Sequence, residues 1–288
     1  DMHKGFDASI TWTDHINDFN YSIGGNITYS RFWDWEQYKP RFSNSWDEYR
    51  NSIWHRVGYV NWGYEAIGRF QNWEQIANYP IDNDRKGNRT VVPGDIMYKD
   101  QNNDGVINYL DERPIGYRVD STPTLNFGIN LSASWKGFDL AMDWTGSGMT
   151  SWNQCYETAR PFQNDGNSPD EVLKDAWHLS DIWDANSPLI PGKYPMIRLN
   201  TDETSAYDKS SYWLHNVTYL KLRNLEVGYT FPKTWLNKTG ISNLRLFVSG
   251  TNLLTLSNLS VMDPECASDN GLDYPPMRVI NIGVNLKF

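Results

Sequence analysis

The sequence lacks the motifs that most enzymes and redox proteins carry. Its five histidines fall in no metal-ligand spacing, and no GxSxG, HExxH or glycine-rich phosphate loop is present. Only two cysteines occur, Cys155 and Cys266, far apart in polar sequence and without CxxC spacing. The sequence therefore predicts that the chain is not an enzyme. In an oxidising compartment the two thiols would be able to pair across two loops, and the sequence leaves that pairing open.

Basic residues and long apolar runs are also scarce. Lysine and arginine number 26 against 35 acidic residues, so the net charge is -9 and nucleic acid is not an expected partner. No run of 18 apolar residues occurs and the mean hydropathy is -0.64, which excludes a bundle of membrane-spanning helices. A membrane β-barrel stays compatible with these values, because its strands alternate apolar and polar residues.

Aromatic residues, by contrast, are abundant, at 15% of the chain with 14 tryptophans and 17 tyrosines. Such an excess is typical of rings at a membrane interface or of surfaces on which sugars stack, and both interpretations stay open. We expect an interface girdle from the aromatics near predicted strand ends, namely Trp12, Tyr29, Trp135, Trp144 and Tyr229. The loop aromatics are the better sugar candidates, although burial in folded loops is their default: Trp152, Tyr156, Trp177, Trp183, Tyr212 and Trp213.

Alternation with period two predicts strands of about ten residues, the length that a tilted strand needs to cross a bilayer. In residues 125–136, one face carries Leu125, Phe127, Ile129, Leu131, Ala133 and Trp135, and a turn at Gly137 leads into the next strand. Similar patterns cover residues 6–12, 19–29, 138–144, 219–231, 244–248 and 280–288. The parity changes around Arg223 and Asn224, which predicts a β-bulge.

The predicted connections alternate in length, as in outer-membrane barrels with short periplasmic turns and long outer loops. The short ones lie near residues 14–18, 137 and 232–242, and the long ones at 32–124, 148–217 and 255–278. This predicts seven strands, or nine if residues 54–70 hide a further hairpin. A plugged barrel needs about 22 strands, so the others must lie outside this chain. Because residues 1–6 resemble no signal peptide, we expect the chain to begin inside a larger protein.

An acidic loop predicts a calcium site. The side chains of Asp100, Asn102, Asp104, Asn108 and Asp111 and the backbone carbonyl of Val106 follow the spacing of ligands in a calcium-binding loop, with Gly105 at its sharp turn. The final position holds aspartate instead of the usual glutamate, although Glu112 follows. The alternative is a plain turn rich in Asp and Asn. Calcium, if bound, would be a structural cofactor that rigidifies an outer loop.

Several motifs together resemble the SusC/RagA family of TonB-linked outer-membrane proteins. They are Pro93-Gly94-Asp95-Ile96, Tyr98-Lys99-Asp100, Asn103-Asp104-Gly105-Val106-Ile107, Phe127-Gly128-Ile129-Asn130-Leu131, Trp135-Lys136-Gly137-Phe138-Asp139-Leu140, Tyr219-Leu220-Lys221-Leu222-Arg223-Asn224-Leu225, Gly228-Tyr229-Thr230, Ser249-Gly250-Thr251-Asn252-Leu253-Leu254, Asp263-Pro264-Glu265, Tyr274-Pro275 and Gly283-Val284-Asn285-Leu286-Lys287-Phe288. Their order and spacing follow the family's C-terminal third across most of the chain.

The resemblance implies an all-β fold, with residues 1–288 as the C-terminal segment of an antiparallel transmembrane barrel that has long extracellular loops. It implies active import of oligosaccharides or peptides across the Gram-negative outer membrane. The implied partners are the TonB complex, a SusD-like lipoprotein lid and the membrane lipid, while the plug and the N-terminal region are expected outside this chain. The alternative is a soluble, secreted, calcium-stabilised carbohydrate-binding β-module, whose strands would be about five or six residues long.

Overall fold

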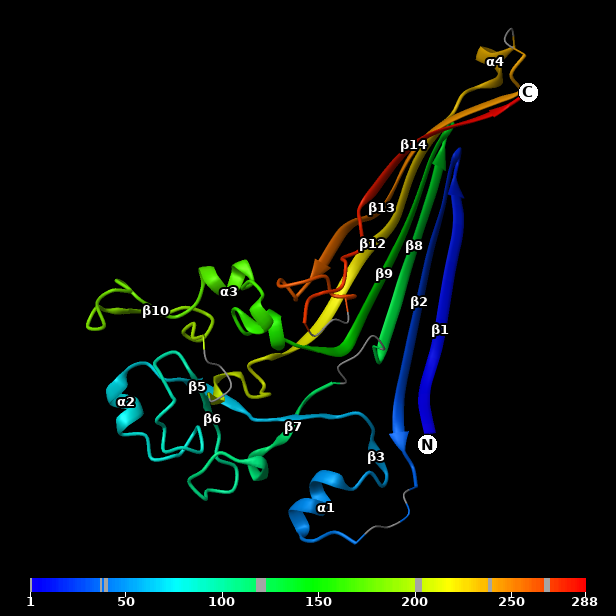
Figure 1. Cartoon of the computed structure of the whole chain (residues 1–288). Coiled ribbons are helices and arrows are strands. Elements are labelled where there is room, and N and C mark those ends of the chain that lie inside the picture. The colour runs from blue at the N-terminus through cyan, green and yellow to red at the C-terminus, as the bar shows by residue number, and fades with distance from the viewer. Residues whose placement is uncertain are drawn as a thin grey trace.

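The computed structural model describes residues 2–36, 38, 41–117, 123–199, 204–237, 240–266 and 270–288. Its main feature is a tall antiparallel sheet with seven long strands (Figure 1). Across the sheet these are β1 (Met2–Ile16), β2 (Phe19–Asp34), β8 (Leu125–Trp135), β9 (Phe138–Asn153), β12 (Leu214–Thr230), β13 (Asn243–Ser257) and β14 (Val279–Lys287). Each long strand pairs with the next long strand along the chain. The strands β1 and β14 form the two edges, so the sheet is open.

Two tight turns explain why consecutive strands pair. The β1–β2 turn has Asn17 at φ 54°, and the β8–β9 turn has Lys136 at φ 46° and Gly137 at φ 92°. Such left-handed backbone matches the twist of the strands that a two-residue turn joins. At Gly137 a Cβ atom would lie 2.6 Å from the carbonyl oxygen of Thr230, so the close approach of β12 also favours glycine. The predicted turn at Gly137 is confirmed.

The two faces of the sheet separate apolar from polar side chains, as the alternation predicts. Ile10 is 76% exposed and Ile282 is 83% exposed, both on the apolar face. Phe127, Ile129, Ile282 and Leu286, which a compact core would have buried, are absent from every buried cluster of the described residues. The predicted bulge is confirmed, because the register of β12 shifts between Leu222 and Asn224 against both β9 and β13.

Residues 54–70 do not form the further long hairpin that would have given nine strands. They contain β3 (Arg56–Val57), which pairs with the end of β2, and also β4 (Asn61–Gly63) and β5 (Ala66–Arg69). The last two pair with β7 (Arg113–Gly116) and β6 (Ile96–Tyr98), away from the long sheet. The apolar residues of this stretch serve a loop core instead, since Tyr64 and Phe70 are buried there.

The first two long connections lie at one end of the sheet and fold into a loop module, which we define as the described residues of 41–117 and 154–213 (Figure 1). Its short elements are α1 (Ser45–Asn51), α2 (Trp73–Ala77), η1 (Tyr109–Asp111), η2 (Tyr156–Thr158), η3 (Gln163–Asp165), α3 (Asp170–Lys174), β10 (His178–Leu179), β11 (Leu189–Ile190) and η4 (Ser205–Tyr207). At the other end, α4 (Lys233–Leu236) occupies the short connection between β12 and β13. The predicted alternation of short and long connections is confirmed.

A shared core holds the loop module together. It combines Tyr64, Ile96 and Tyr98 of the first connection with Tyr194 and Trp213 of the second. Asn44 and Asn72 start α1 and α2, because each side chain accepts a hydrogen bond from a backbone N–H in the first turn. None of the helices in the described part of the chain has the length and apolar character required to cross a membrane.

Candidate substrate path on the polar face

Hydrogen bonds between side chains of different strands order the polar face of the long sheet. Asn130 Nδ2 donates to Asp143 Oδ1 at 2.7 Å, which joins β8 to β9. Further along, Arg245 of β13 reaches Asp139 of β9 at 3.0 Å and Glu226 of β12 at 2.6 Å. Because their partners hold these side chains, the face presents fixed donors and acceptors rather than freely rotating ones.

A charged cluster fastens the last long connection to this face. Lys221 of β12 is 1% exposed, and its Nζ lies 2.8 Å from both carboxylate oxygens of Asp263 and 2.9 Å from Glu265 Oε2. Glu265 also binds Arg223. A buried lysine keeps its charge only when it is paired, so the two carboxylates explain its tolerated burial. Burial raises the pKa of Glu265, but the hydrogen bonds from Arg223 and Lys221 outweigh it and lower the pKa below its usual value.

Three hollows follow one another from the loop module to the polar face. The outer pocket, of about 490 Å³, lies between α1, β3 and β4, and the middle pocket, of about 480 Å³, lies where β1 and β2 meet the loop module. These two share Val57, Gly58, Tyr59, Val60 and Pro114. The inner pocket, of about 360 Å³, lies on the polar face and shares Asn126 with the middle pocket. The three hollows are therefore adjacent to one another along the sheet.

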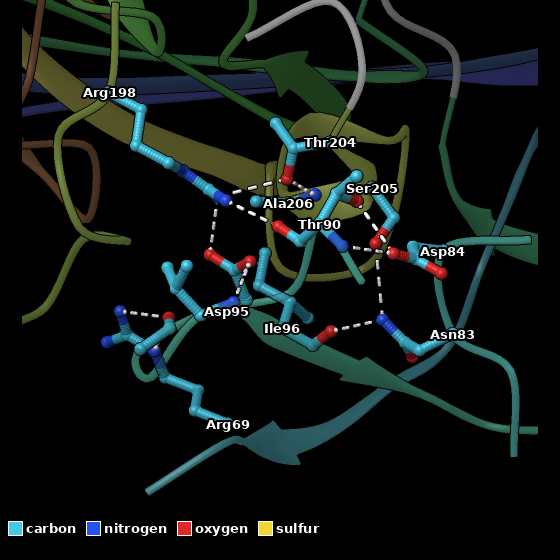
Figure 2. A network of polar contacts seen from close by, with 12 residues as sticks. Arg69, Asn83, Asp84, Thr90, Asp95, Ile96, Arg198, Thr204, Ser205 and Ala206 are labelled. Atoms are coloured by element: carbon cyan, nitrogen blue, oxygen red, sulfur yellow. Dashed lines mark hydrogen bonds and ion pairs between the residues drawn. The ribbon is translucent and has the colours of Figure 1, made fainter. Parts of the chain in front are cut away.

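A buried ion pair connects the two halves of the loop module (Figure 2). Arg198 Nη2 binds Asp95 Oδ1 at 2.7 Å and Thr204 Oγ1 at 3.0 Å, and its Nη1 donates to the carbonyl of Thr90 at 2.8 Å. Asp95 is completely buried. Burial raises the pKa of Asp95 to about 6, although the adjacent Arg198 opposes that shift. The carboxylate therefore depends on its arginine to stay charged at neutral pH.

Two neighbouring polar side chains extend this network (Figure 2). Asn83 Nδ2 donates to the carbonyl of Ile96 at 3.0 Å and to Ser205 Oγ at 3.3 Å. Asp84 accepts hydrogen bonds from the backbone N–H groups of Lys86, Asn88 and Thr90. Burial raises the pKa of Asp84, but these bonds and that of the Thr90 hydroxyl outweigh it and lower the pKa to about 2. The network positions loops, and no substrate-facing role follows from it.

The predicted calcium ligands lie in one loop, but they do not all converge. Asp100 accepts the backbone N–H groups of Asn103, Asp104 and Gly105. Asn102 and Asn108 both donate to Asp104 Oδ2, at 2.9 and 3.3 Å.

Asp111, by contrast, is buried and accepts hydrogen bonds from the backbone N–H groups of Gln101 and Asn108. Within the described ranges, no three histidine, cysteine or acidic side chains gather in a metal-binding arrangement. Calcium would therefore need amide and carbonyl oxygens, including that of Val106, in addition to the carboxylates of Asp100 and Asp104, and its binding remains a prediction.

The aromatic residues divide between core and surface. Trp152, Trp177 and Trp213 are buried, which is the default expected for aromatic residues of folded loops. Trp183, in contrast, is 90% exposed. Trp135 ends β8 and Tyr229 lies next to the end of β12, but Trp12, Tyr29 and Trp144 lie inside strands, because β1, β2 and β9 continue beyond their predicted bounds. The prediction of a strand-end position is wrong for those three. Cys155 and Cys266 form no disulfide with one another.

Sequence reasoning missed the residues of the outer pocket. Tyr49 and Trp62 lie in its wall with Arg50 and Arg56. They come from α1, β3 and β4, elements too short for periodicity to reveal. The available signal was composition alone, since aromatic and arginine residues alternate repeatedly between Tyr49 and Trp62.

The sequence matches TonB-dependent receptors. TonB-dependent receptor P3 of Formosa agariphila is 30% identical over 243 residues, which cover 78% of this chain and 22% of the relative. TonB-dependent receptor SusC of Bacteroides thetaiotaomicron is 24% identical over 252 residues, covering 81% and 20%. The chain belongs to the SusC/RagA family of TonB-dependent receptors. No family model matches the sequence.

The fold agrees with this family. A solved structure of the RagAB peptide transporter aligns with 99% of this chain and 29% of its own, with a TM-score of 0.64 and 22% identity. The RagAB peptide importer in a closed-closed state aligns equally well, with a TM-score of 0.63. The chain spans about a fifth of the length of the curated relatives it matches. The SusC/RagA family comprises receptors rather than enzymes, in agreement with the sequence prediction.

Proposed function

We propose that this chain forms part of the wall of an outer-membrane importer that takes up oligosaccharides or peptides by a TonB-dependent mechanism. The observation that carries the proposal is the open sheet of seven long strands, apolar on one face and polar on the other, in a SusC/RagA chain. Open edges and an exposed apolar face are unfavourable in a soluble protein. They are accounted for if further strands complete a barrel of about 22 strands in lipid.

In this proposal residues 1–288 are the C-terminal segment of the barrel, and the loop module faces the cell exterior. The apolar face contacts lipid, and the polar face lines the lumen beside a plug encoded elsewhere in the receptor. The outer, middle and inner pockets then follow the direction of import. A SusD-like lipoprotein would cover the loop module, and the inner-membrane TonB complex would supply the energy through the receptor's N-terminal part.

The two faces predict opposite labelling in the full-length receptor. In a background with Cys155 and Cys266 replaced by serine, Asn130→Cys should react with a membrane-impermeant maleimide in purified receptor reconstituted into liposomes. Ile129→Cys, its neighbour on the apolar face of β8, should be protected by lipid and react only after denaturation. Equal labelling of the two cysteines would exclude the proposed orientation.

Import itself is tested in the source bacterium. Loss of the receptor gene and loss of TonB should each abolish growth on the same oligosaccharide or peptide mixture as sole carbon source. Growth that persists without TonB but stops without the receptor would contradict energised import.

A further inference from the structure

We infer that the outer pocket binds a carboxylate-bearing sugar unit of an acidic oligosaccharide. The inference deepens the proposed import function, on which it rests for the way the ligand reaches the pocket. It is carried by two aromatic rings in the pocket wall, a third ring packed against them, two arginines and a volume of about 490 Å³.

The rings form a cluster beside α1. Tyr49 and Trp62 meet edge to face with centroids 5.2 Å apart, and Trp46 packs against both at 5.5 and 5.9 Å. Tyr49 remains 40% exposed and lines the pocket together with Trp62. Exposed aromatic faces fixed by their neighbours offer stacking area at little cost in side-chain entropy, and the C–H face of a pyranose ring fits such a surface.

The arginines add charge at the same place. Arg50 lies 4.5 Å above the ring of Trp62, and its Nε binds Glu112 at 3.1 Å. Arg56 lies 5.5 Å above the ring of Tyr49 and donates to the backbone carbonyl of that residue. Arg56 lines the pocket, and among the described residues it has no ion pair. A guanidinium is suited to bind a carboxylate through two parallel hydrogen bonds.

The local charge differs from that of the whole chain. Asp34 is the one acidic residue in the pocket lining, against two arginines, whereas the chain as a whole carries a net charge of -9. Arg50 is already paired with Glu112, so Arg56 is the arginine of the lining that can attract an anionic ligand to this point.

The geometry favours a sugar over a peptide. Peptides bound in extended form usually add a strand to an exposed sheet edge. The short strands in this pocket, β3 and β4, are two and three residues long and already pair with β2 and β7. The pocket thus offers rings and a guanidinium but little strand edge.

The test measures binding to the purified full-length receptor in detergent at low ionic strength. The probes are tetragalacturonate, its fully methyl-esterified form, which keeps the sugar backbone without the charge, and a tetraglutamate peptide. We expect tetragalacturonate to bind tightest, and Arg56→Gln to raise its Kd about tenfold or more, the loss typical of a hydrogen bond to a charged group. Arg56→Lys should lie between the two, and the ester should be insensitive to both changes.

Arg41→Gln is the matched control, because Arg41 is exposed in the same connection and lies outside the pocket lining. Tyr49→Leu should weaken acid and ester alike, because it removes the stacking surface and not the charge. Resistance of the loop module to protease checks that each variant is folded.

Equal affinity for acid and ester, tighter binding of the peptide, or an Arg56→Gln variant that binds as the wild type does would each overturn the inference. Binding in detergent needs no TonB, so the site and the import proposal fail separately. Specific binding without TonB-dependent uptake would refute import alone.

Discussion

The long sheet and the loop module use apolar residues in opposite ways. In the sheet, Ile10 and Ile282 stand exposed on one face, and the polar side chains are ordered on the other. In the loop module, Ile96, Tyr98 and Trp213 are buried together, as in a water-soluble domain. Two parts of one chain thus obey the same hydrophobic effect against what we propose are two different solvents.

The two regions also differ in how they hold charge. On the sheet, Arg245 bridges two carboxylates on the polar face and remains partly accessible to water. In the loop module, the Asp95 carboxylate is removed from water completely and depends on Arg198. Loss of the Arg198 cation should therefore destabilise the loop module far more than a loss of packing at the surface of the module.

The largest expected effect is on that ion pair. Arg198→Ala leaves the buried Asp95 carboxylate without its cation, and removal of one partner of a buried pair typically costs about 3 to 5 kcal/mol. Hydrogen exchange should show the loop module opening while the amides of β8 and β9 stay protected. Lys174→Ala, which breaks an exposed pair with Asp170, is the control and should change little. An equal loss of protection in the sheet would contradict the independence of the two regions.

The second effect tests the solvent around the sheet. Ile129→Arg places a charge on the apolar face near the middle of β8, where lipid would make it cost roughly 2 to 4 kcal/mol. Asn130→Arg, one residue along on the polar face, should cost much less. Unfolding of the full-length receptor in liposomes by urea measures both. Similar costs at the two positions would mean that the two faces do not meet different solvents.

The third effect is the pH dependence of the module. The pKa of Asp95 rises from 3.8 to about 6 on folding, so between these values the folded state holds more protons than the unfolded state. The free energy of unfolding should therefore fall as the pH rises from about 4 to about 6, by on the order of 2 kcal/mol from this group.

Asp95→Asn should flatten that slope without abolishing it, because burial also raises the pKa of Asp208 in the same module. Urea unfolding followed by the protease resistance of the loop module at several pH values gives the comparison. An unchanged slope in the variant would show that Asp95 does not titrate in this range.

The sequence predicted the sheet much better than the loop module, for a physical reason. Alternation at Leu125, Phe127 and Ile129, and the parity change at Arg223, follow from strand geometry and are visible locally. The module instead depends on contacts between residues more than 100 positions apart, such as Arg198 with Asp95, which no local period encodes. For the same reason the calcium motif was visible as a local spacing, whereas the outer pocket, built by α1, β3 and β4, was not.

The smallest effect concerns that calcium loop, which belongs to the module and not to the sheet. If the prediction is right, Asp104→Ala should lower the calcium affinity of the full-length receptor about tenfold, since it removes a ligand at the centre of the loop. Asp170→Ala removes an exposed acid of the same module and should leave the affinity unchanged. Calorimetric titration with calcium measures both variants.

Calcium should also slow hydrogen exchange in residues 100–111 while leaving β8 and β9 unaffected, because a structural ion orders the loop that supplies its ligands. An unchanged calcium affinity in Asp104→Ala would contradict the predicted site. The loop would then be a hydrogen-bonded turn, in which Asp100 and Asp111 accept hydrogen bonds from backbone N–H groups.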